Sequence, residues 1–179
     1  MVQLAKDPLI SEFDIKVRLQ DLVLDIARDL KQHELTIIGI LRGSFMFTAD
    51  LVRLLYTNDM HPLIDFVYVT SYAGSESTGE MKLLKEPSLD VRDKWVLVVD
   101  DILDTGRTMH YAVNYLKDRG AAQVRSCVLL DKPTRRIVDI HSDYVGFTID
   151  DIFVVGYGLD YNGRFRDLPY IGMMDEPVE

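Results

Sequence analysis

Residues 96–108 read VLVVDDILDTGRT, and this stretch joins an apolar run to a cluster of polar groups. Its first four residues predict a buried strand. The carboxylates of Asp100 and Asp101 follow at once, and Asp104 comes three residues later. The turn 105–108 then begins a helix, where free backbone N–H groups and two hydroxyl groups suit an anion, and its glycine lets the backbone approach a ligand closely. The segment therefore predicts a site with acceptors for sugar hydroxyls or a metal next to donors for a phosphate.

A plainer interpretation of the same residues is helix capping. Asp and Thr are common N-terminal caps, and Asp104 or Thr105 alone would be interpreted as one. Three carboxylates with a Thr-Gly-x-Thr turn after an apolar strand are harder to explain in this way, because neighbouring carboxylates repel one another. We therefore favour a binding site.

Strand and helix patterns alternate on both sides of this stretch. Ser11 and Asp14 have the spacing of a capping box, and apolar residues then recur at steps of three and four up to Leu30, which predicts an amphipathic helix. The helix that begins at the central turn is expected to end at Arg119, because Gly120 is a suitable C-terminal cap. The other predicted elements are strands at 35–41, 64–70, 95–99, 124–130, 144–149 and 153–157 and a helix at 45–56. This order predicts an α/β domain with a mainly parallel central sheet flanked by helices.

Three of the predicted strands end in unusual polar turns. These turns are RGS at 42–44, SYAGSES at 71–77 and the acidic turn at 100–108. Ligands of parallel sheets bind at the carboxyl ends of the strands, so the three turns together predict a binding site at one sheet edge. Residues 71–82 have almost no apolar anchor, and a loop of this length predicts a mobile lid.

Composition narrows the class of protein. The chain has 179 residues, of which 47% are hydrophobic and 27% charged, with a formal net charge of −9. This length predicts one domain over residues 1–179, and the negative charge argues against a nucleic-acid binder, which normally has a basic face. No apolar run approaches the ~20 residues that cross a bilayer, and the first residues lack a signal-peptide pattern. We therefore expect a cytoplasmic protein without nucleic-acid or membrane partners.

The remaining reactive residue types point to no further site. Cys127 is the only cysteine, and it lies in an apolar run, which predicts a small buried hydrophobe. The four histidines have no metal-ligand spacing, and we interpret them as structural or surface residues: His33, His61, His110 and His141.

The segment 96–108 resembles, at all thirteen positions, the phosphoribosyl-pyrophosphate motif of type I phosphoribosyltransferases. Other segments are similar to the hypoxanthine (hypoxanthine-guanine) phosphoribosyltransferases of that family: LRGS at 41–44, SYAGSESTGEMK at 71–82, LLDKP at 129–133, FVVGYGLDYN at 153–162 and FRDLPYIG at 165–172. The resemblance covers residues 11–174. It implies transfer of a 5-phosphoribosyl group from phosphoribosyl pyrophosphate to a 6-oxopurine with Mg²⁺, for purine salvage. It also implies a small hood formed by the terminal segments, and a homodimer or homotetramer.

The resemblance assigns most of the polar residues to the phosphoribosyl donor. Asp100 and Asp101 would hold the ribose hydroxyls, directly or through Mg²⁺, although many relatives have the longer Glu at position 100. The 5′-phosphate would be held by Thr105, Gly106, Arg107 and Thr108, and the pyrophosphate by Arg166 and by the backbone of Arg42 and Gly43. Family members have a non-proline cis peptide at the position of Leu41-Arg42.

The resemblance assigns a second set of residues to the purine, the metal and the reaction. Lys132 would donate to the purine O6 atom, Phe153 would stack on the base and Val154 would contribute its backbone carbonyl. Asp160 would bind a second Mg²⁺. Asp104 would take or share the proton at N7, and Ser71 and Tyr72 would close over the reacting centre.

Each of these assignments has a structural alternative. An isolated lysine is usually a solvated surface residue, an aromatic residue beside a strand is usually core, and Asp160 with Arg166 could be a surface salt bridge. Three other functions share some of these features. A response-regulator receiver domain has its acidic pair near the start of the domain and lacks the Thr-Gly-x-Thr turn. An RNA-binding regulator on the same fold would need a local basic face. Transfer to xanthine, adenine or a pyrimidine is disfavoured by Lys132 beside Phe153 and Val154, because an ammonium cannot accept a hydrogen bond from a 6-amino group.

Overall fold

The computed structural model describes residues 4–71 and 81–174, and its centre is a six-stranded sheet with the strand order β3-β2-β1-β4-β5-β6. The strands are β1 (Leu35–Leu41), β2 (Leu63–Ser71), β3 (Met81–Lys85), β4 (Trp95–Leu103), β5 (Gln123–Asp131) and β6 (Tyr144–Thr148). All neighbouring strands pair in parallel except β2 and β3, which are antiparallel. The predicted α/β fold with a mainly parallel sheet is confirmed.

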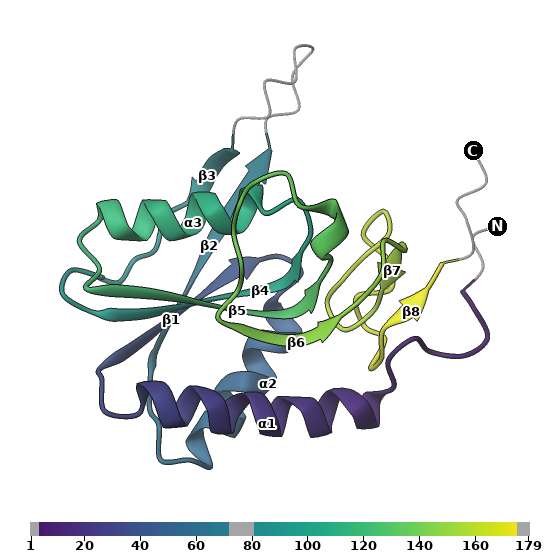
Figure 1. Cartoon of the computed structure of the whole chain (residues 1–179), viewed down its shortest axis with the longest axis horizontal. Helices are drawn as coiled ribbons and strands as arrows, with labels where there is room; N and C mark the ends of the chain where they lie inside the picture. Colours follow the sequence, from purple (N-terminus) through teal and green to yellow (C-terminus); the bar gives the residue numbers. More distant parts are fainter. Residues whose placement is uncertain (1–3, 72–80, 175–179) are drawn as a thin grey trace.

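Helices cover both faces of this sheet (Figure 1). The helices α1 (Glu12–Leu30) and α2 (Phe45–Tyr56) lie on one face, and α3 (Arg107–Asp118) lies on the other. Successive side chains of a strand point to opposite faces, and β4 shows the consequence. Leu97 and Val99 pack into the apolar cluster that includes α1 and α2, whereas Val96 and Val98 pack into the cluster that includes α3. A strand buried on both faces supports the residues at its carboxyl end rigidly.

The first helix forms as its sequence predicts. The Ser11 Oγ atom accepts a hydrogen bond from the Asp14 backbone N–H (3.1 Å), and the Asp14 carboxylate accepts one from the Ser11 backbone N–H (3.3 Å). This reciprocal capping box satisfies two groups that a helix start leaves without partners. The apolar residues at steps of three and four are all buried: Ile15, Leu19, Leu22, Val23, Ile26 and Leu30.

The two ends of the described chain build a small hood beside the sheet. The strands β7 (Val154–Val155) and β8 (Gly172–Met173) form an antiparallel pair, and isolated bridges join Leu4 to Met174 and Ile10 to Ile171. Figure 1 shows the hood next to the ends of β5 and β6. The hood of terminal segments implied by the family resemblance is present.

Several predicted boundaries differ from the structure. We expected β4 to end at Val99, but it continues to Leu103, because its pairing with β5 extends as far as Leu103 with Asp131. The predicted loop 71–82 has strand residues at both ends, since β2 includes Ser71 and β3 begins at Met81. The predicted strand 153–157 is only two residues long, because Gly156 adopts a φ of +99° and turns the chain. Cys127 is fully buried, as predicted. Within residues 4–71 and 81–174, no helix combines the length and the apolar character that crossing a membrane requires.

Candidate active site

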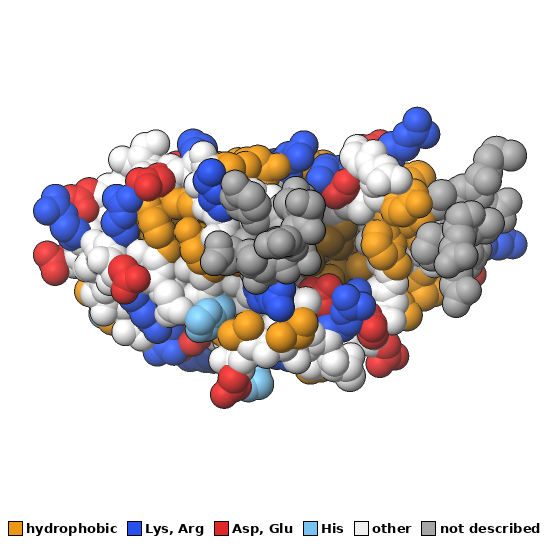
Figure 2. All heavy atoms as spheres, turned by 90° about the horizontal axis from the view of Figure 1, so that it is seen from above, with side chains coloured by type: hydrophobic (Ala, Val, Ile, Leu, Met, Phe, Trp, Pro, Cys, Tyr) orange, Lys and Arg blue, Asp and Glu red, His pale blue; other side chains and the backbone are white. Residues whose placement is uncertain are grey.

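The site lies where the sheet changes its winding direction. Strands β1 and β4 are neighbours, but the helices that follow them, α2 and α3, lie on opposite faces, so their connections diverge and leave a crevice at the carboxyl ends. A cavity of about 960 Å³ occupies this region, and Figure 2 shows a hollow there with acidic and basic side chains beside it. The cavity is lined by residues of the turns after β1 and β4, by strand residues on either side of the predicted loop 71–82, and by the hood, including Gly43, Asp101, Asp104, Thr105, Lys132 and Arg166. The turn predicted at 71–77 lies almost wholly outside the described residues.

The turn after β1 touches the end of β4 directly. A Cβ atom at Gly43 would lie 1.6 Å from Asp101 Oδ2, so only a glycine leaves room for this carboxylate. On the other side, a Cβ atom at Gly158 would lie 2.0 Å from the Gly43 carbonyl oxygen. The peptide Leu41-Arg42 is cis, as the resemblance implied, and the Arg42 guanidinium donates to the Tyr68 hydroxyl (3.1 Å) at the rim. The structure therefore brings together three residues that were predicted to bind phosphoribosyl pyrophosphate: Arg42, Gly43 and Asp101.

Asp100 and Asp101 form an acidic pair in which Asp100 is buried and Asp101 is half-buried. The Asp100 side chain is only 5% exposed and lines a second cavity of about 310 Å³, which Asp101 and Gly106 also line. The removal of water raises the pKa of Asp100 well above its usual value, and the charge of Asp101 raises it further. Burial also raises the pKa of Asp101, although hydrogen bonds and the nearby Arg166 partly oppose this rise. A neighbouring cation, or hydroxyl groups that donate hydrogen bonds, would stabilise the charged forms of these two carboxylates.

The turn 105–108 has the geometry of an anion site. Gly106 adopts a φ of +87° as the N-cap of α3, and no side chain caps this helix start. The Thr105 carbonyl accepts hydrogen bonds from the backbone N–H groups of Ile137 and Val138 (3.0 and 3.2 Å), which fixes the turn from outside. The Arg107 N–H makes one long contact with Thr105 Oγ1 (3.5 Å), and Thr105, Arg107 and Thr108 line the cavity. A helix start of this kind, whose N-cap residue offers no side-chain acceptor, is the arrangement that binds phosphate.

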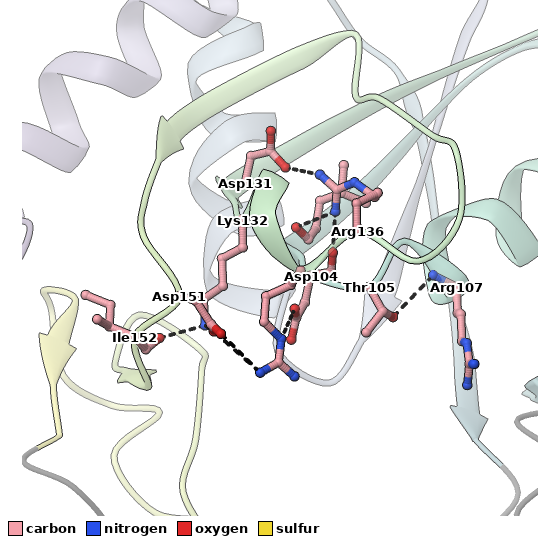
Figure 3. A network of polar contacts seen from close by, with 10 residues as sticks. Asp104, Thr105, Arg107, Asp131, Lys132, Arg136, Asp151 and Ile152 are labelled. Carbon is pink, nitrogen blue, oxygen red and sulfur yellow. Dashed lines mark hydrogen bonds and ion pairs between the residues drawn. The ribbon is translucent and has the colours of Figure 1, made fainter.

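Lys132 is buried and lines the same cavity. Its side chain follows β5 directly, the residue is 6% exposed, and its Nζ atom donates to the Ile152 carbonyl oxygen (2.6 Å; Figure 3). A solvated surface lysine, the alternative interpretation, is therefore wrong. Phe153 is 48% exposed and meets the Tyr161 ring edge-on at a centroid distance of 5.8 Å. Phe153 is thus no core residue either, and it offers an exposed ring next to Val154 at the cavity wall.

Asp160 and Arg166 are paired and also line the cavity. The Arg166 guanidinium lies 2.6 Å from Asp160 Oδ1 and donates to the Gly158 carbonyl (2.5 Å), while Asp160 Oδ2 accepts the Gly163 backbone N–H (2.6 Å). The two side chains are only 24% and 30% exposed. The salt bridge considered as an alternative does form, but it forms inside the cavity and places Arg166 near Asp101.

The sequence analysis did not single out four residues at this site: Arg135, Arg136, Asp151 and Ile152. Arg135 donates from Nε to Asp104 Oδ1 (3.0 Å), and its Nη1 atom lies 3.4 Å from the Asp151 carboxylate. Arg136 donates to the carbonyl oxygens of Leu103 (2.8 Å) and Asp104 and to the Asp131 carboxylate. Ile152 supplies the acceptor for Lys132. The visible signal was the basic pair directly after LLDKP, together with the acidic pair at 150–151.

The two predicted closing residues cannot be placed in the site. Ser71 is the last residue of β2, and Tyr72 lies outside the described residues. Their catalytic roles stay predictions.

Asp100, Asp101 and Asp160 are the candidate metal ligands of this site. Within the described parts of the chain, no group of three or more His, Cys, Asp or Glu side chains could hold a metal by itself. Mg²⁺ is usually bound by one or two carboxylates together with substrate phosphates, and it does not need a cage made by protein alone. Asp101 and Asp160 line the cavity of about 960 Å³, and Asp100 lines the second cavity that Asp101 shares, so these carboxylates beside an anion site fit this mode of binding.

Comparison with known proteins agrees with this geometry. Residues 13–162 match the model of the phosphoribosyl transferase domain. The hypoxanthine-guanine phosphoribosyltransferase of Staphylococcus epidermidis is 44% identical over 174 residues, which are 97% of this chain and 96% of that protein. The crystal structure of a hypoxanthine phosphoribosyltransferase from Staphylococcus aureus superposes with a TM-score of 0.89 at 42% identity, covering 95% of this chain and 91% of that one. The Trypanosoma cruzi hypoxanthine phosphoribosyltransferase in complex with the product IMP superposes with a TM-score of 0.91 at 36% identity, covering 98% and 97%. The chain thus belongs to the phosphoribosyltransferase family and, within it, to the hypoxanthine-guanine phosphoribosyltransferases.

Proposed function

We propose that this protein transfers the 5-phosphoribosyl group of phosphoribosyl pyrophosphate to hypoxanthine or guanine, giving IMP or GMP and pyrophosphate in purine salvage. The observation that carries this proposal is the shared cavity of about 960 Å³. It is lined by Asp101, by the turn residues Thr105, Arg107 and Thr108, and by a buried lysine with an exposed aromatic ring, Lys132 and Phe153. Asp100 lines the adjoining cavity of about 310 Å³ together with Asp101. A phosphorylated sugar suits the carboxylates and the turn, and a flat base with an oxygen substituent suits the lysine and the ring.

The donor binds across the turns that follow β1 and β4. The amides and hydroxyl groups of the turn 105–108 hold the 5′-phosphate, and Asp100 and Asp101 accept hydrogen bonds from the ribose hydroxyls. The pyrophosphate is assigned to the Arg166 guanidinium and to the backbone N–H groups of Arg42 and Gly43. Arginine suits this task because its planar fork can make two parallel hydrogen bonds to a phosphate.

Magnesium binding is assigned to the carboxylates of Asp100, Asp101 and Asp160, shared with the substrate. When bound, Mg²⁺ neutralises charge on the pyrophosphate as it departs. The raised pKa values of the buried pair support this assignment, because a neighbouring cation would offset the burial of two like charges.

The purine is held by three other groups. The Lys132 ammonium donates to O6, the Phe153 ring stacks on the base, and the Val154 carbonyl accepts from the purine edge. In the reaction the bond between C1 of the ribose and the pyrophosphate oxygen breaks, and a bond from C1 to N9 of the purine forms. The purine loses one proton, and Asp104 accepts or shares it at N7, as a general base within hydrogen-bond reach.

The assembly and location follow from the same proposal. We expect residues 1–179 to act as one cytoplasmic domain that assembles into a homodimer or homotetramer. Exposed apolar side chains on α1 support a contact between copies: Phe13, Val17 and Leu24 are 72%, 42% and 58% exposed. Light scattering after size exclusion should give a mass of two or four chains, and a single-chain mass at assay concentration would contradict the assembly.

An assay of four bases tests the function. Hypoxanthine, guanine, xanthine and adenine are each incubated with phosphoribosyl pyrophosphate, with and without Mg²⁺, and nucleotide formation is followed by absorbance. Hypoxanthine and guanine should react in the presence of Mg²⁺, and adenine should not, because the Lys132 ammonium cannot accept from a 6-amino group. Turnover of adenine equal to that of hypoxanthine would refute the role of Lys132.

A further inference from the structure

Arg135 joins the two ends of the purine site. Its Nε atom donates to Asp104 Oδ1 (3.0 Å), and its Nη1 atom lies 3.4 Å from both oxygens of Asp151. Asp151 in turn lies 3.9 Å from the Nζ atom of Lys132. In Figure 3 the dashed lines connect Asp104 and Asp151 through this one guanidinium. A continuous chain of charges therefore runs from the proposed proton acceptor to the proposed O6 donor.

The backbone that carries Arg135 is tied to the backbone of Asp104. Arg135 ends the short 3-10 helix η1 (Pro133–Arg135), whose N-cap is Lys132. The Lys132 N–H donates to the Leu103 carbonyl (3.0 Å), and the Arg136 guanidinium donates to the carbonyl oxygens of Leu103 and Asp104. These contacts fix the base of the Arg135 side chain relative to Asp104, and Asp151 holds the far end of its guanidinium.

We propose that Arg135 is a positioning residue for proton transfer: it holds one oxygen of Asp104 and leaves the other oxygen aimed at the purine. This inference rests on the proposed function, because it assigns Arg135 a task only if Asp104 accepts the purine proton. A carboxylate held through one oxygen loses rotational freedom, and a general base depends on such alignment for its effect. A planar guanidinium can hold two carboxylates at once, which the point charge of a lysine cannot do in the same way.

The Arg135 ion pairs contribute little to folding. The side chains of Arg135, Asp104 and Asp151 are 47%, 37% and 48% exposed, and ion pairs at such exposure contribute little to stability. A substitution at Arg135 should therefore leave the fold intact, so that a change in rate can be assigned to the site.

The test is a double-mutant cycle on full-length protein with hypoxanthine, phosphoribosyl pyrophosphate and Mg²⁺. Nucleotide formation is measured in a single turnover with enzyme in excess, because product release can limit the steady-state rate. Asp104→Asn should slow the single turnover about 100-fold, which is the range of a general base. Arg135→Gln should slow it about tenfold with less than about a threefold change in the dissociation constant of hypoxanthine, because a small misplacement affects the reaction more than binding. In the Asp104→Asn background, Arg135→Gln should have no further effect on the rate, since the two residues act as a unit.

Arg125→Gln is the matched control. Arg125 also lies on the β5 side of the sheet, pairs with Asp143 at 2.6 Å and is 43% exposed, but it does not line the cavity. This variant should keep the wild-type rate, and the thermal midpoints of both arginine variants should agree within a few degrees.

The outcomes separate this inference from the proposed function. A wild-type protein that forms no nucleotide would overturn the proposed function and the inference together. An unchanged rate in Asp104→Asn would remove Asp104 as the base and the inference with it, while the transfer itself would stand. If Asp104→Asn is slow but Arg135→Gln reacts as fast as wild type or faster, only the inference fails. It also fails if Arg135→Gln slows the Asp104→Asn protein by the same factor as it slows wild type.

Discussion

At the scale of single residues, Gly43 leaves the room that the Asp101 carboxylate occupies. A Cβ atom there would lie 1.6 Å from Asp101 Oδ2, so Gly43→Ala must displace the carboxylate or the turn. We expect the affinity for phosphoribosyl pyrophosphate to fall about 100-fold, because a small misplacement at a site can have an effect of this size. Titration calorimetry with the donor and Mg²⁺ checks this, and an affinity within twofold of wild type would show that Asp101 does not bind the donor in this position.

The buried ammonium of Lys132 leads to a second prediction at this scale. Lys132→Gln keeps a hydrogen-bond donor but removes the charge, and a hydrogen bond to a charged group contributes about 1.5–3 kcal/mol. The KM for hypoxanthine should therefore rise about 10- to 100-fold, while the KM for the donor should stay within about threefold. Steady-state kinetics with each substrate varied in turn separates the two constants. Equal weakening of both substrates would point to a disturbed fold and away from a specific purine contact.

The residues of the site could be predicted only where the chain itself places them together. Asp100, Asp101 and the turn 105–108 are contiguous, so their chemistry was visible in the sequence. Lys132 was assigned by resemblance, and the structure adds the reason: its side chain is buried and its ammonium meets the Ile152 carbonyl. Arg135 was missed, because its assignment to the site depends on contacts with Asp104 and Asp151, which are 31 and 16 residues away along the chain.

At the scale of elements, the carboxyl end of β4 has a carboxylate that is assigned to substrate binding but lowers the stability of the fold. Burial and the charge of Asp101 raise the pKa of Asp100, so the folded state keeps its proton to a higher pH than the unfolded state, whose aspartates titrate near ~3.9. The free energy of unfolding therefore decreases as the pH rises from about 4 through the raised pKa. Above that pH the folded chain contains a buried charge that the unfolded chain would expose.

Asp100→Asn should remove this cost. In buffer with EDTA at pH 7, we expect the thermal midpoint of the variant to exceed that of wild type by roughly 2–4 °C, the shift that ~1 kcal/mol produces in a domain of this size. As the pH falls below 4 the midpoints should converge, because the wild-type carboxyl then becomes neutral in the unfolded state as well as in the folded state. The variant should also bind the donor more weakly, which is the usual trade between stability and function. A lower midpoint at pH 7, or the same gain at pH 4, would contradict this account of β4.

Element boundaries were less predictable than element types. Apolar alternation predicted β4 only to Val99, because the strand continues through two aspartates that apolar patterns do not include. Its continuation depends on pairing with β5, as far as Leu103 with Asp131, which is a tertiary property. The strand β3 was missed for a similar reason: Met81–Lys85 has only a weak alternating pattern and becomes a strand by pairing with β2. By contrast, α1 was predicted well, because its cap and its apolar face are both local signals.

At the scale of the whole molecule, the strand order creates the site. The sequence predicted an α/β fold with a parallel sheet, and it predicted that three polar turns would meet at one sheet edge. It could not show that β1 and β4 are neighbours, since about sixty residues separate them along the chain and only the sheet brings them together. The hood was predicted from resemblance alone, because the strand predicted at 153–157 indicated no partner and β8 is too short to give a pattern of its own.

The position of the bound donor tests the central claim most directly. A crystal of this protein soaked with phosphoribosyl pyrophosphate and Mg²⁺ should show the 5′-phosphate on the amides of residues 105–108, with the ribose hydroxyls toward Asp100 and Asp101. The pyrophosphate should then lie between Gly43 and Arg166. A structure in which the donor is bound elsewhere, while the turn 105–108 holds no phosphate, would contradict the account.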